Sequence, residues 1–321
     1  MPAKVIIDAA VPYIRGVLEP WFDVEYLPAA QMDAAAVKDA SALIIRTRTK
    51  CNAALLEGSN VKFIATATIG MDHIDRPWCA SAGITAVNAP GCNADGVMEW
   101  VFAALSHLPF GRPLEGMTLG VVGVGEVGGR VADMGRRRGF RVLENDPPKQ
   151  AAGFARHFTP LETLLCESDI VTVHIPLWSE NFHFAGERFF EKMKPGAAFL
   201  NAARGGVADE AALLALRGRL GPLAIDVWEG EPDINPATLA AADIATPHIA
   251  GYTAAGKVNA TVAAVRSLAK FFGISELLQF EIKHDFLPYN IEGYDILADD
   301  RMLREHPSDF ELLRTRYRLR G

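Results

Sequence analysis

Short apolar runs alternate with helix-length amphipathic segments along almost the whole chain. The runs are rich in valine, isoleucine and alanine, as in residues 4–8 (KVIID) and 118–123 (TLGVVG). Continuous apolar strands separated by helices indicate parallel sheets that are covered on both faces. The pattern therefore predicts a doubly wound α/β protein. The expected strands lie within residues 4–8, 22–27, 42–46, 62–68, 84–89, 118–123, 140–146, 169–175, 197–203, 223–228 and 243–248.

Two segments with helical periodicity organise these strands into domains. Residues 91–108 carry apolar residues at helical spacing and predict a hinge helix, and residues 254–272 predict a helix that returns the chain to the first domain. We therefore expect two Rossmann-like parallel-sheet domains with an interdomain cleft. Residues 1–92 and 250–272 would form a discontinuous lid domain, and residues 93–249 the second domain. Residues 273–321 are too polar to make a core alone, which indicates a tail or part of an interface.

Length, charge and cysteine usage narrow the class of protein. The chain has 321 residues, enough for two domains, and half of them are hydrophobic. Lys plus Arg number 32 against 39 Asp plus Glu, and the net charge of −7 argues against nucleic-acid or anionic-membrane partners. The four cysteines form no CxxC pair, and no stretch approaches the roughly 20 apolar residues of a membrane span. We expect a soluble cytoplasmic protein.

A glycine-rich sequence between an expected strand and an expected helix indicates a dinucleotide site. Gly123, Gly125 and Gly128 form GxGxxG, which permits a tight turn, a close approach of backbone amides to a pyrophosphate, and close helix–strand packing. Asp146 ends the next strand, where a carboxylate hydrogen-bonds ribose hydroxyls and repels a 2′-phosphate. The motif predicts NAD. The alternative is a glycine turn in an ordinary βαβ unit with Asp146 as a solvated helix cap.

Three polar stretches follow later strands at their carboxyl ends, where ligands bind in such sheets. They contain Arg204, Glu231 and His248. Oxidation of a secondary alcohol needs a base for the hydroxyl proton, which histidine supplies, and a nearby carboxylate stabilises the imidazolium that forms. An arginine binds a carboxylate bidentately. Together the residues predict oxidation of a 2-hydroxy acid, although singly they are also compatible with a local ion pair, a solvated turn and a packed histidine.

These stretches also carry a resemblance to the D-2-hydroxyacid dehydrogenase family. It covers about residues 40–260 and lies in the glycine motif, NAARGG, DVWEGEP and PHIAGYT. The resemblance implies that Arg204 binds the substrate carboxylate, that Glu231 partners the histidine, and that His248 accepts the proton. It implies cofactor contacts from Gly123, Gly125, Glu126, Val127, Gly128, Asp146, Ile175, Ala202, Ala203, Arg204, Asp226 and Gly251.

Other stretches, among them IRTRTK, TATIGMDHID and HIAGYTAAGK, most resemble the branch of the family that acts on 4-phospho-D-erythronate. That resemblance implies NAD-dependent oxidation to 3-hydroxy-2-oxo-4-phosphobutanoate in pyridoxal 5′-phosphate (vitamin B6) biosynthesis. It also implies a homodimer with a dimerisation segment in residues 273–321, which we expect to be incomplete in this chain. Thr47, Thr68 and Tyr252 match substrate-contacting positions. Arg46 follows an expected strand and could meet the substrate phosphate or form a solvated basic rim.

Other functions fit the same residues. A phosphoglycerate or glyoxylate/hydroxypyruvate dehydrogenase would use the same three residues, because they recognise only the shared hydroxy-acid group. A non-catalytic NAD-sensing protein could also retain all three. No histidine has ligand spacing and no acidic cluster indicates a bound ion, so we expect no metal. His174 ends an expected strand, and we expect it to line the cofactor site or to pack rather than to catalyse.

Overall fold

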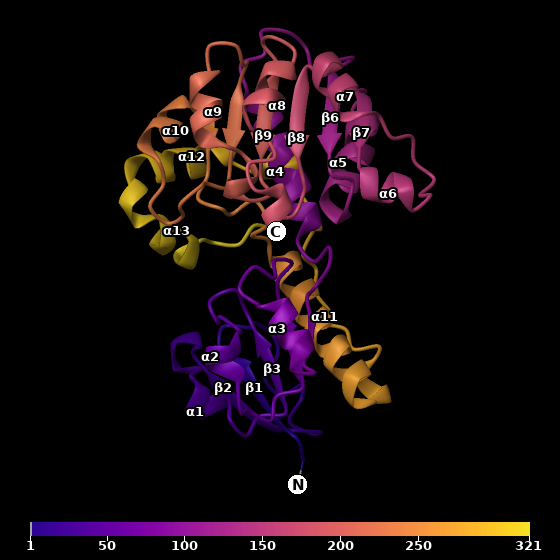
Figure 1. The fold of residues 1–321 in the computed structure, drawn as a ribbon, viewed down its shortest axis with the longest axis vertical. Helices are drawn as coiled ribbons and strands as arrows, with labels where there is room; N and C mark the ends of the chain where they lie inside the picture. Colours follow the sequence, from indigo (N-terminus) through magenta and orange to yellow (C-terminus); the bar gives the residue numbers. More distant parts are fainter. Residues whose placement is uncertain (1) are drawn as a thin grey trace. The chain divides into compact units, whose positions relative to one another are not determined.

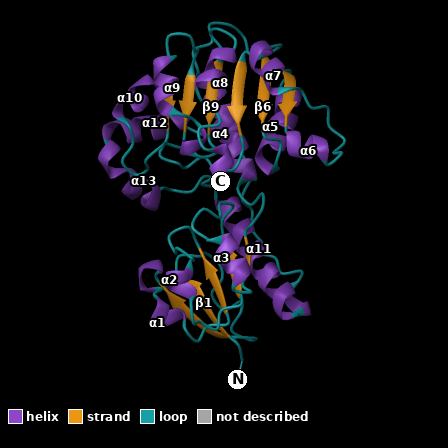
Figure 2. Ribbon diagram, in the orientation of Figure 1, coloured by secondary structure: helices purple, strands orange, loops and turns teal. Residues whose placement is uncertain are grey.

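The computed structural model describes residues 2–321, which form two compact units. Unit 1 comprises the chain up to Asn93, Thr253–Leu287 and Gly321, and unit 2 comprises Ala94–Tyr252 and Pro288–Arg320. Each unit is built on one parallel sheet with helices on both faces (Figures 1 and 2). The predicted doubly wound α/β class is thereby confirmed, and each expected strand segment contains a strand.

The sheet of unit 1 has the strand order β2-β1-β3-β4-β5, and all neighbouring strands are parallel. Val5 and Ile7 of β1 pack on the side of helix α11, whereas Ile6 packs with the short helices on the opposite face. Because both faces are buried, the strands read as continuous apolar runs. The strands are β1 (Lys4–Asp8), β2 (Asp23–Leu27), β3 (Ala42–Ile45), β4 (Phe63–Thr66) and β5 (Thr85–Val87), and the helices α1 (Ala34–Val37), α2 (Ala53–Leu56), α3 (Arg76–Ser81) and α11 (Ala254–Phe272).

The sheet of unit 2 has the strand order β11-β10-β9-β8-β6-β7 and is also parallel throughout. From β6 the chain passes to β7 at one edge and then returns to β8 on the other side of β6. The point where strand order reverses is where doubly wound sheets bind ligands, beyond the carboxyl ends of the strands. The strands are β6 (Thr118–Val122), β7 (Arg141–Asn145), β8 (Ile170–Val173), β9 (Ala198–Asn201), β10 (Leu223–Ile225) and β11 (Ile244–Ala245).

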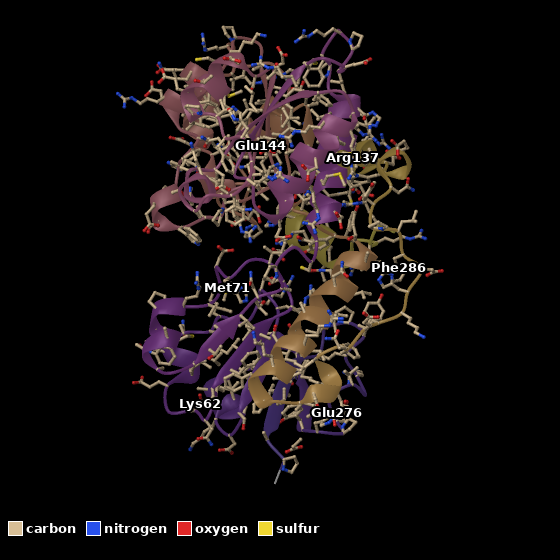
Figure 3. The ribbon with its side chains drawn as sticks, turned by 90° about the vertical axis from the view of Figure 1, so that its right-hand side faces the viewer. Lys62, Met71, Arg137, Glu144, Glu276 and Phe286 are labelled. Carbon is tan, nitrogen blue, oxygen red and sulfur yellow. The ribbon has the colours of Figure 1, made fainter. Side chains whose placement is uncertain are left out.

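Helices cover both faces of this second sheet. Helix α4 lies within the expected hinge segment, residues 91–108, and packs Trp100, Val101 and Leu105 into one apolar cluster. Phe190 of α8 belongs to the cluster on the other face. Figure 3 shows Glu144 of β7 inside unit 2, where its carboxylate accepts from Arg136 and Arg156. The helices are α4 (Ala94–His107), α5 (Glu126–Arg137), α6 (Pro147–Ala151), α7 (Leu161–Glu167), α8 (Glu187–Lys192), α9 (Glu210–Ala215), α10 (Pro236–Ala241), α12 (Ile296–Glu305) and α13 (Phe310–Arg316).

Residues 273–321, treated as one segment in the sequence analysis, are divided between the two units. Residues up to Leu287 belong to unit 1, and Pro288–Arg320 belong to unit 2. Helix α12 packs beside β11 and α4, and α13 follows it (Figure 1, yellow); Leu303 and Phe310 enter one apolar cluster of unit 2. Asp300 of α12 accepts the Ala245 N–H of β11 at 2.7 Å. Among the residues described, no helix is both long and apolar enough to cross a membrane.

Candidate active site

The glycine-rich loop closes tightly between β6 and α5. Gly123 has φ +83°, a left-handed conformation that glycine adopts without strain, and a Cβ there would lie 2.7 Å from the His174 carbonyl oxygen. A Cβ on Gly128 would lie 1.9 Å from the Gly123 carbonyl oxygen, so helix and loop can approach this closely only through glycine. Gly125 caps α5, and a Cβ on it would meet nothing within 4 Å. The position beside Gly125, at the N-terminus of α5, is therefore open.

The neighbouring cofactor candidates lie around this loop. Ile175 is beside Gly123, because its Cγ2 would be 2.7 Å from a Cβ built there. Glu126 and Val127 form the start of α5, and the Glu126 carboxylate is 2.8 Å from Arg130 on the next turn. The positive charge of Arg130 thus partly neutralises the Glu126 carboxylate at the N-terminus of α5. A helix N-terminus favours anions, so a bound anion there would meet less repulsion from Glu126.

Asp146 both caps a helix and contacts the glycine-rich loop. Its Oδ1 accepts the Lys149 N–H of α6 at 3.0 Å, and its Oδ2 accepts the Val124 N–H at 2.9 Å. Asp146 is therefore a helix cap, as one of the two alternatives from the sequence predicted. This role does not exclude ribose binding, because each carboxylate oxygen accepts more than one hydrogen bond.

Arg204 lies in a constrained loop after β9. The buried Asn201 side chain accepts the Ala203 N–H at 3.0 Å and donates to the Arg204 carbonyl at 3.0 Å. Gly205 packs against the chain after β10, where a Cβ would lie 1.9 Å from the Trp228 carbonyl oxygen. Ala202 and Ala203 are half-buried in the same loop. Asn201 and Gly205 thus fix the backbone from which the guanidinium extends.

Glu231 and His248 form a hydrogen-bonded pair. His248 Nδ1 is 2.8 Å from Glu231 Oε2, and Glu231 Oε1 accepts the Trp228 N–H at 2.9 Å. Burial alone raises the pKa of Glu231, but the charge of His248 and these hydrogen bonds outweigh it, so the pKa lies below its ordinary value. Because an ionised carboxylate only accepts, Nδ1 carries the proton and Nε2 can accept another.

Asp226 supports the loop that follows His248. Its side chain is 1% exposed, and its carboxylate accepts from the Thr246 hydroxyl at 2.6 Å, the Ile249 N–H at 2.8 Å and the Ala250 N–H at 3.0 Å. Burial raises the pKa of this carboxyl, although those donors and His248 act against the rise. His248 itself has φ +55°, and its N–H donates to the Asp226 carbonyl at 2.7 Å. The left-handed backbone at His248 is therefore held by Asp226.

The three predicted catalytic residues line a single pocket of about 270 Å³. Glycine and carboxylate residues of the loop after β10 form one part of its wall, and Leu177 and Phe182 form an apolar part. His174 is not among the lining residues. Burial lowers the pKa of His174 to about 3, and its ring is 3.0 Å from the Thr172 hydroxyl. A histidine that stays neutral cannot alternate between base and acid near neutral pH, so His248 is the better candidate.

Unit 1 contains three of the predicted substrate-binding residues, Arg46, Thr47 and Thr68. Arg46 directly follows β3, and Thr68 lies just after the adjacent parallel strand β4, so both lie at the same edge of the sheet. The Arg46 guanidinium donates to the Ala10 carbonyl at 3.3 Å, and the Thr68 hydroxyl is 2.8 Å from that of Thr66. Tyr252 is the last residue of the first segment of unit 2, and Gly251 directly precedes it. Among residues 2–321, no cluster of His, Cys, Asp and Glu is arranged to hold a metal ion.

Several residues that support the site carry no role in the sequence-based prediction. Asn201 fixes the Arg204 loop, and Glu210 of α9 accepts the Glu229 N–H at 2.8 Å and the Thr238 hydroxyl at 2.7 Å. The position of Asn201 directly before the AAR sequence was an available signal, since short polar side chains at strand ends commonly bond local backbone. Glu210 gave no such signal, because it looks like an ordinary first-turn helix residue.

Comparison with known proteins places this geometry in a family. Residues 98–250 match the model described as D-isomer specific 2-hydroxyacid dehydrogenase, NAD binding domain. The chain is 44% identical to erythronate-4-phosphate dehydrogenase from Bacteroides fragilis over 335 residues, covering 99% of this chain and 96% of that enzyme. The chain belongs to the erythronate-4-phosphate dehydrogenase family. The family resemblance and the NAD cofactor expected from the sequence are thereby confirmed.

Solved structures of related enzymes have the same fold. D-lactate dehydrogenase from Aquifex aeolicus, complexed with NAD and lactic acid, matches with a TM-score of 0.73 and 27% identity over 86% of this chain and 97% of that one. NAD-bound 3-phosphoglycerate dehydrogenase from Entamoeba histolytica matches with a TM-score of 0.73 and 25% identity, over 88% and 99% of the two chains. This chain thus shares its fold with two dehydrogenases named for different hydroxy acids.

Asp146 is expected to set the preference for NAD over NADP. Replacing Asp146 with asparagine should lower the ratio of kcat/KM for NAD to that for NADP by about tenfold or more, because the charge that repels a 2′-phosphate is lost. The asparagine oxygen can still cap α6, but the amide nitrogen cannot accept the Val124 N–H, so some fall in melting temperature is expected as well. Measuring both cofactors with the wild type and with Asp133→Asn, an exposed carboxylate on α5, gives the control. An unchanged ratio in Asp146→Asn would remove Asp146 from the ribose site.

We expect Glu231 to make the free energy of unfolding rise as the pH rises through the acidic range. Its lowered pKa means that ionised Glu231 stabilises the fold above the ordinary carboxyl value of 4.5, and that this contribution is lost as pH falls through the folded pKa. Glu231→Gln should therefore be less stable than the wild type at pH 7, by on the order of 1–2 kcal/mol. The deficit should shrink below about pH 4.5.

For Glu210→Gln, we expect the difference in unfolding free energy from the wild type to change with pH in the opposite direction. Burial raises the pKa of Glu210, so ionisation disfavours the fold and this variant should gain stability relative to the wild type as pH rises. Urea unfolding from pH 3.5 to 7.5 measures both differences. Equal slopes for the two variants would contradict the assignment of an ionised, stabilised Glu231.

Proposed function

We propose that this protein oxidises 4-phospho-D-erythronate to 3-hydroxy-2-oxo-4-phosphobutanoate with NAD, a reaction of pyridoxal 5′-phosphate biosynthesis. One observation carries the proposal: the 2.8 Å His248–Glu231 pair shares a pocket with Arg204 in a chain related to erythronate-4-phosphate dehydrogenases over 99% of its length. The family supplies the substrate, and the pocket supplies the groups that its oxidation needs.

The residues of unit 2 divide the chemistry among them. Arg204 binds the substrate carboxylate through its planar guanidinium, which orients the adjacent C2 hydroxyl. His248 Nε2 takes the hydroxyl proton while the hydrogen on C2 leaves as hydride, so that the alcohol becomes a ketone. Glu231 holds Nδ1–H and stabilises the imidazolium that results. In the reverse reaction, His248 returns the proton.

The glycine-rich loop fits NAD. The first-turn amides of α5, which no side chain caps, offer donors to a pyrophosphate, and Asp146 directly follows the neighbouring strand β7 as a ribose acceptor. Asp226 and Gly251 belong to the segments that hold the nicotinamide in this assignment. When bound, NAD supplies the hydride acceptor.

In this proposal, residues of unit 1 provide some of the contacts to the substrate phosphate. Arg46 provides a cation at the carboxyl end of β3, and Thr47 and Thr68 provide hydroxyl donors at the same sheet edge. Tyr252 of unit 2 provides a further hydroxyl near the active-site loop. These roles rest on the family resemblance and on the position of each residue after its strand.

A homodimer completes the proposal. Several leucines of residues 273–321 have exposed side chains, which a subunit interface would bury: Leu278, Leu287, Leu297 and Leu312. Sedimentation equilibrium should give twice the mass of the chain, and a single-chain mass at micromolar concentration would reject the dimer.

Turnover of 4-phospho-D-erythronate with NAD tests the proposed function. The product would be identified by mass, with a 2-oxo acid added to reoxidise any retained cofactor, and D-3-phosphoglycerate and D-glycerate assayed in parallel. Selective oxidation of the four-carbon phosphate is the expected result. Selective turnover of D-3-phosphoglycerate or D-glycerate would support oxidation of a 2-hydroxy acid but would reject 4-phospho-D-erythronate as the substrate. Cofactor binding without turnover of any of the three would favour the NAD-sensing alternative.

A further inference from the structure

Arg320, near the C-terminal end of the chain, lies inside unit 2. Its side chain is 9% exposed, and its Nε is 2.7 Å from Glu99 Oε2 on α4. Nη1 donates to the Ile249 carbonyl at 3.0 Å, and Nη2 donates to the Ala250 carbonyl at 2.5 Å. One guanidinium thus binds a buried carboxylate and two consecutive backbone carbonyls.

The surroundings of this guanidinium are closed and polar. Nη2 also donates to the Gly96 carbonyl at 3.2 Å, and Nη1 to the Tyr317 hydroxyl at 3.3 Å. The Tyr294 ring lies 4.1 Å away, at a distance that suits a cation–π contact. Glu99 is equally enclosed, with its side chain 3% exposed and its Oε1 accepting the Asn290 N–H at 2.5 Å.

A buried ion pair is a poor device for stability alone, because desolvation of both charges offsets their attraction. Well-packed apolar side chains would fill the same space at no such cost. They would leave the carbonyls of Ile249 and Ala250 without this donor, however. The geometry of Arg320 is therefore better explained by the loop that it binds.

That loop directly follows His248. Asp226 accepts the N–H groups of Ile249 and Ala250, and Arg320 donates to the carbonyls of the same two residues. The Arg320 N–H also donates to the Tyr252 carbonyl at 3.2 Å. The loop is thus held by a carboxylate through its donors and by a guanidinium through its acceptors.

We propose that Arg320 is a positioning residue for hydride transfer: it fixes the Ile249–Tyr252 loop and thereby the placement of His248 and of the loop residues assigned to cofactor and substrate. The proposal rests on the proposed function. Arg320 does not touch the reacting atoms. It acts through the backbone that leads from His248 to Tyr252, where displacements of about 1 Å cost up to about 10²-fold in rate.

Four variants test the proposal. Arg320→Met removes the charge and the donors at similar length, and Arg320→Lys keeps the charge but loses the planar fork. The double variant Arg320→Met with Glu99→Met removes both buried charges, so it addresses the possibility that the single variant unfolds. Arg304→Met is the matched control, because Arg304 likewise pairs with a carboxylate, Asp300, and donates to the carbonyls of Leu239 and Ala242.

Amide hydrogen exchange measures how firmly the loop is held, and it requires no substrate. In the double variant, amides of residues 247–253 should exchange on the order of 10-fold faster than in the wild type, and Arg304→Met should leave this peptide unchanged. Unchanged exchange in the double variant would overturn the proposal even if the protein proves to oxidise a different hydroxy acid. Failure of the loop assignment and failure of the substrate assignment are therefore distinguishable.

Kinetics then read the consequence for chemistry. For the hydroxy acid that the wild type oxidises, kcat should fall about 10-fold in the double variant. The kinetic isotope effect with substrate deuterated at C2 should rise, because hydride transfer becomes more rate-limiting. Arg320→Lys should be intermediate. A kcat within twofold of Arg304→Met, at a comparable fall in melting temperature, would reduce Arg320 to a structural residue and overturn the proposal.

Discussion

Replacing His248 with alanine should lower kcat by on the order of 10²-fold or more while leaving the affinity for NAD nearly unchanged. The reason is the orientation fixed by Glu231: with Nδ1 bonded to the carboxylate at 2.8 Å, Nε2 is the nitrogen available to the substrate hydroxyl. Without the imidazole, the group that accepts the hydroxyl proton in the transition state is lost. Steady-state oxidation and cofactor titration by protein fluorescence measure the two quantities.

His183→Ala is the matched control for this experiment. His183 Nε2 is 2.9 Å from Glu229 Oε1, so this residue is also a histidine paired with a glutamate in the same unit. It does not line the pocket, although its neighbour Phe182 does. We expect its substitution to change kcat by less than about threefold, as for residues outside the reacting geometry. Near-normal kcat in His248→Ala, or equal losses in both variants, would remove His248 from its role as base.

Replacing Arg204 with methionine should both raise KM for the hydroxy acid and lower kcat, with a combined loss in kcat/KM on the order of 10²-fold or more. The guanidinium binds the carboxylate in the ground state and also aligns the C2 hydroxyl for His248, so both parameters depend on it. Arg204→Lys should recover only part of the loss, because an ammonium keeps the charge without the planar pair of donors.

Arg219→Met supplies the control for Arg204. The Arg219 guanidinium donates to the carbonyls of Glu191 and Met193, and it is not among the residues that line the pocket. Its loss should affect stability rather than KM. If Arg204→Met raised KM without lowering kcat, the arginine would bind substrate without orienting it.

The sequence predicted the strands because each sheet is buried on both faces, which leaves continuous apolar runs such as Ala42–Ile45. It grouped the three candidate catalytic residues because polar residues in the loops that follow such runs lie at one edge of a parallel sheet. Arg204, Glu231 and His248 do line one pocket.

The support provided by the C-terminal residues was not predictable in the same way. Arg320 and Glu99 are 221 positions apart and follow no shared period, and Glu99 occurs in an apolar helical run where its charge has no visible partner. Residues 273–321 appeared too polar to make a core alone, yet Tyr294, Leu303 and Phe310 are buried in unit 2. Asp300, Arg304 and Arg320 of this segment bind partners from distant segments, which only the fold brings close.

The Asp300–Ala245 hydrogen bond has a consequence for self-association. An outermost strand presents unpaired backbone groups that can template the addition of a strand from another molecule. Here β11 is only Ile244–Ala245, and the N–H of Ala245 is already taken by a helix carboxylate. A second chain therefore cannot extend this sheet through that N–H without displacing α12. The short strand and its engaged N–H therefore disfavour β-mediated aggregation at this edge.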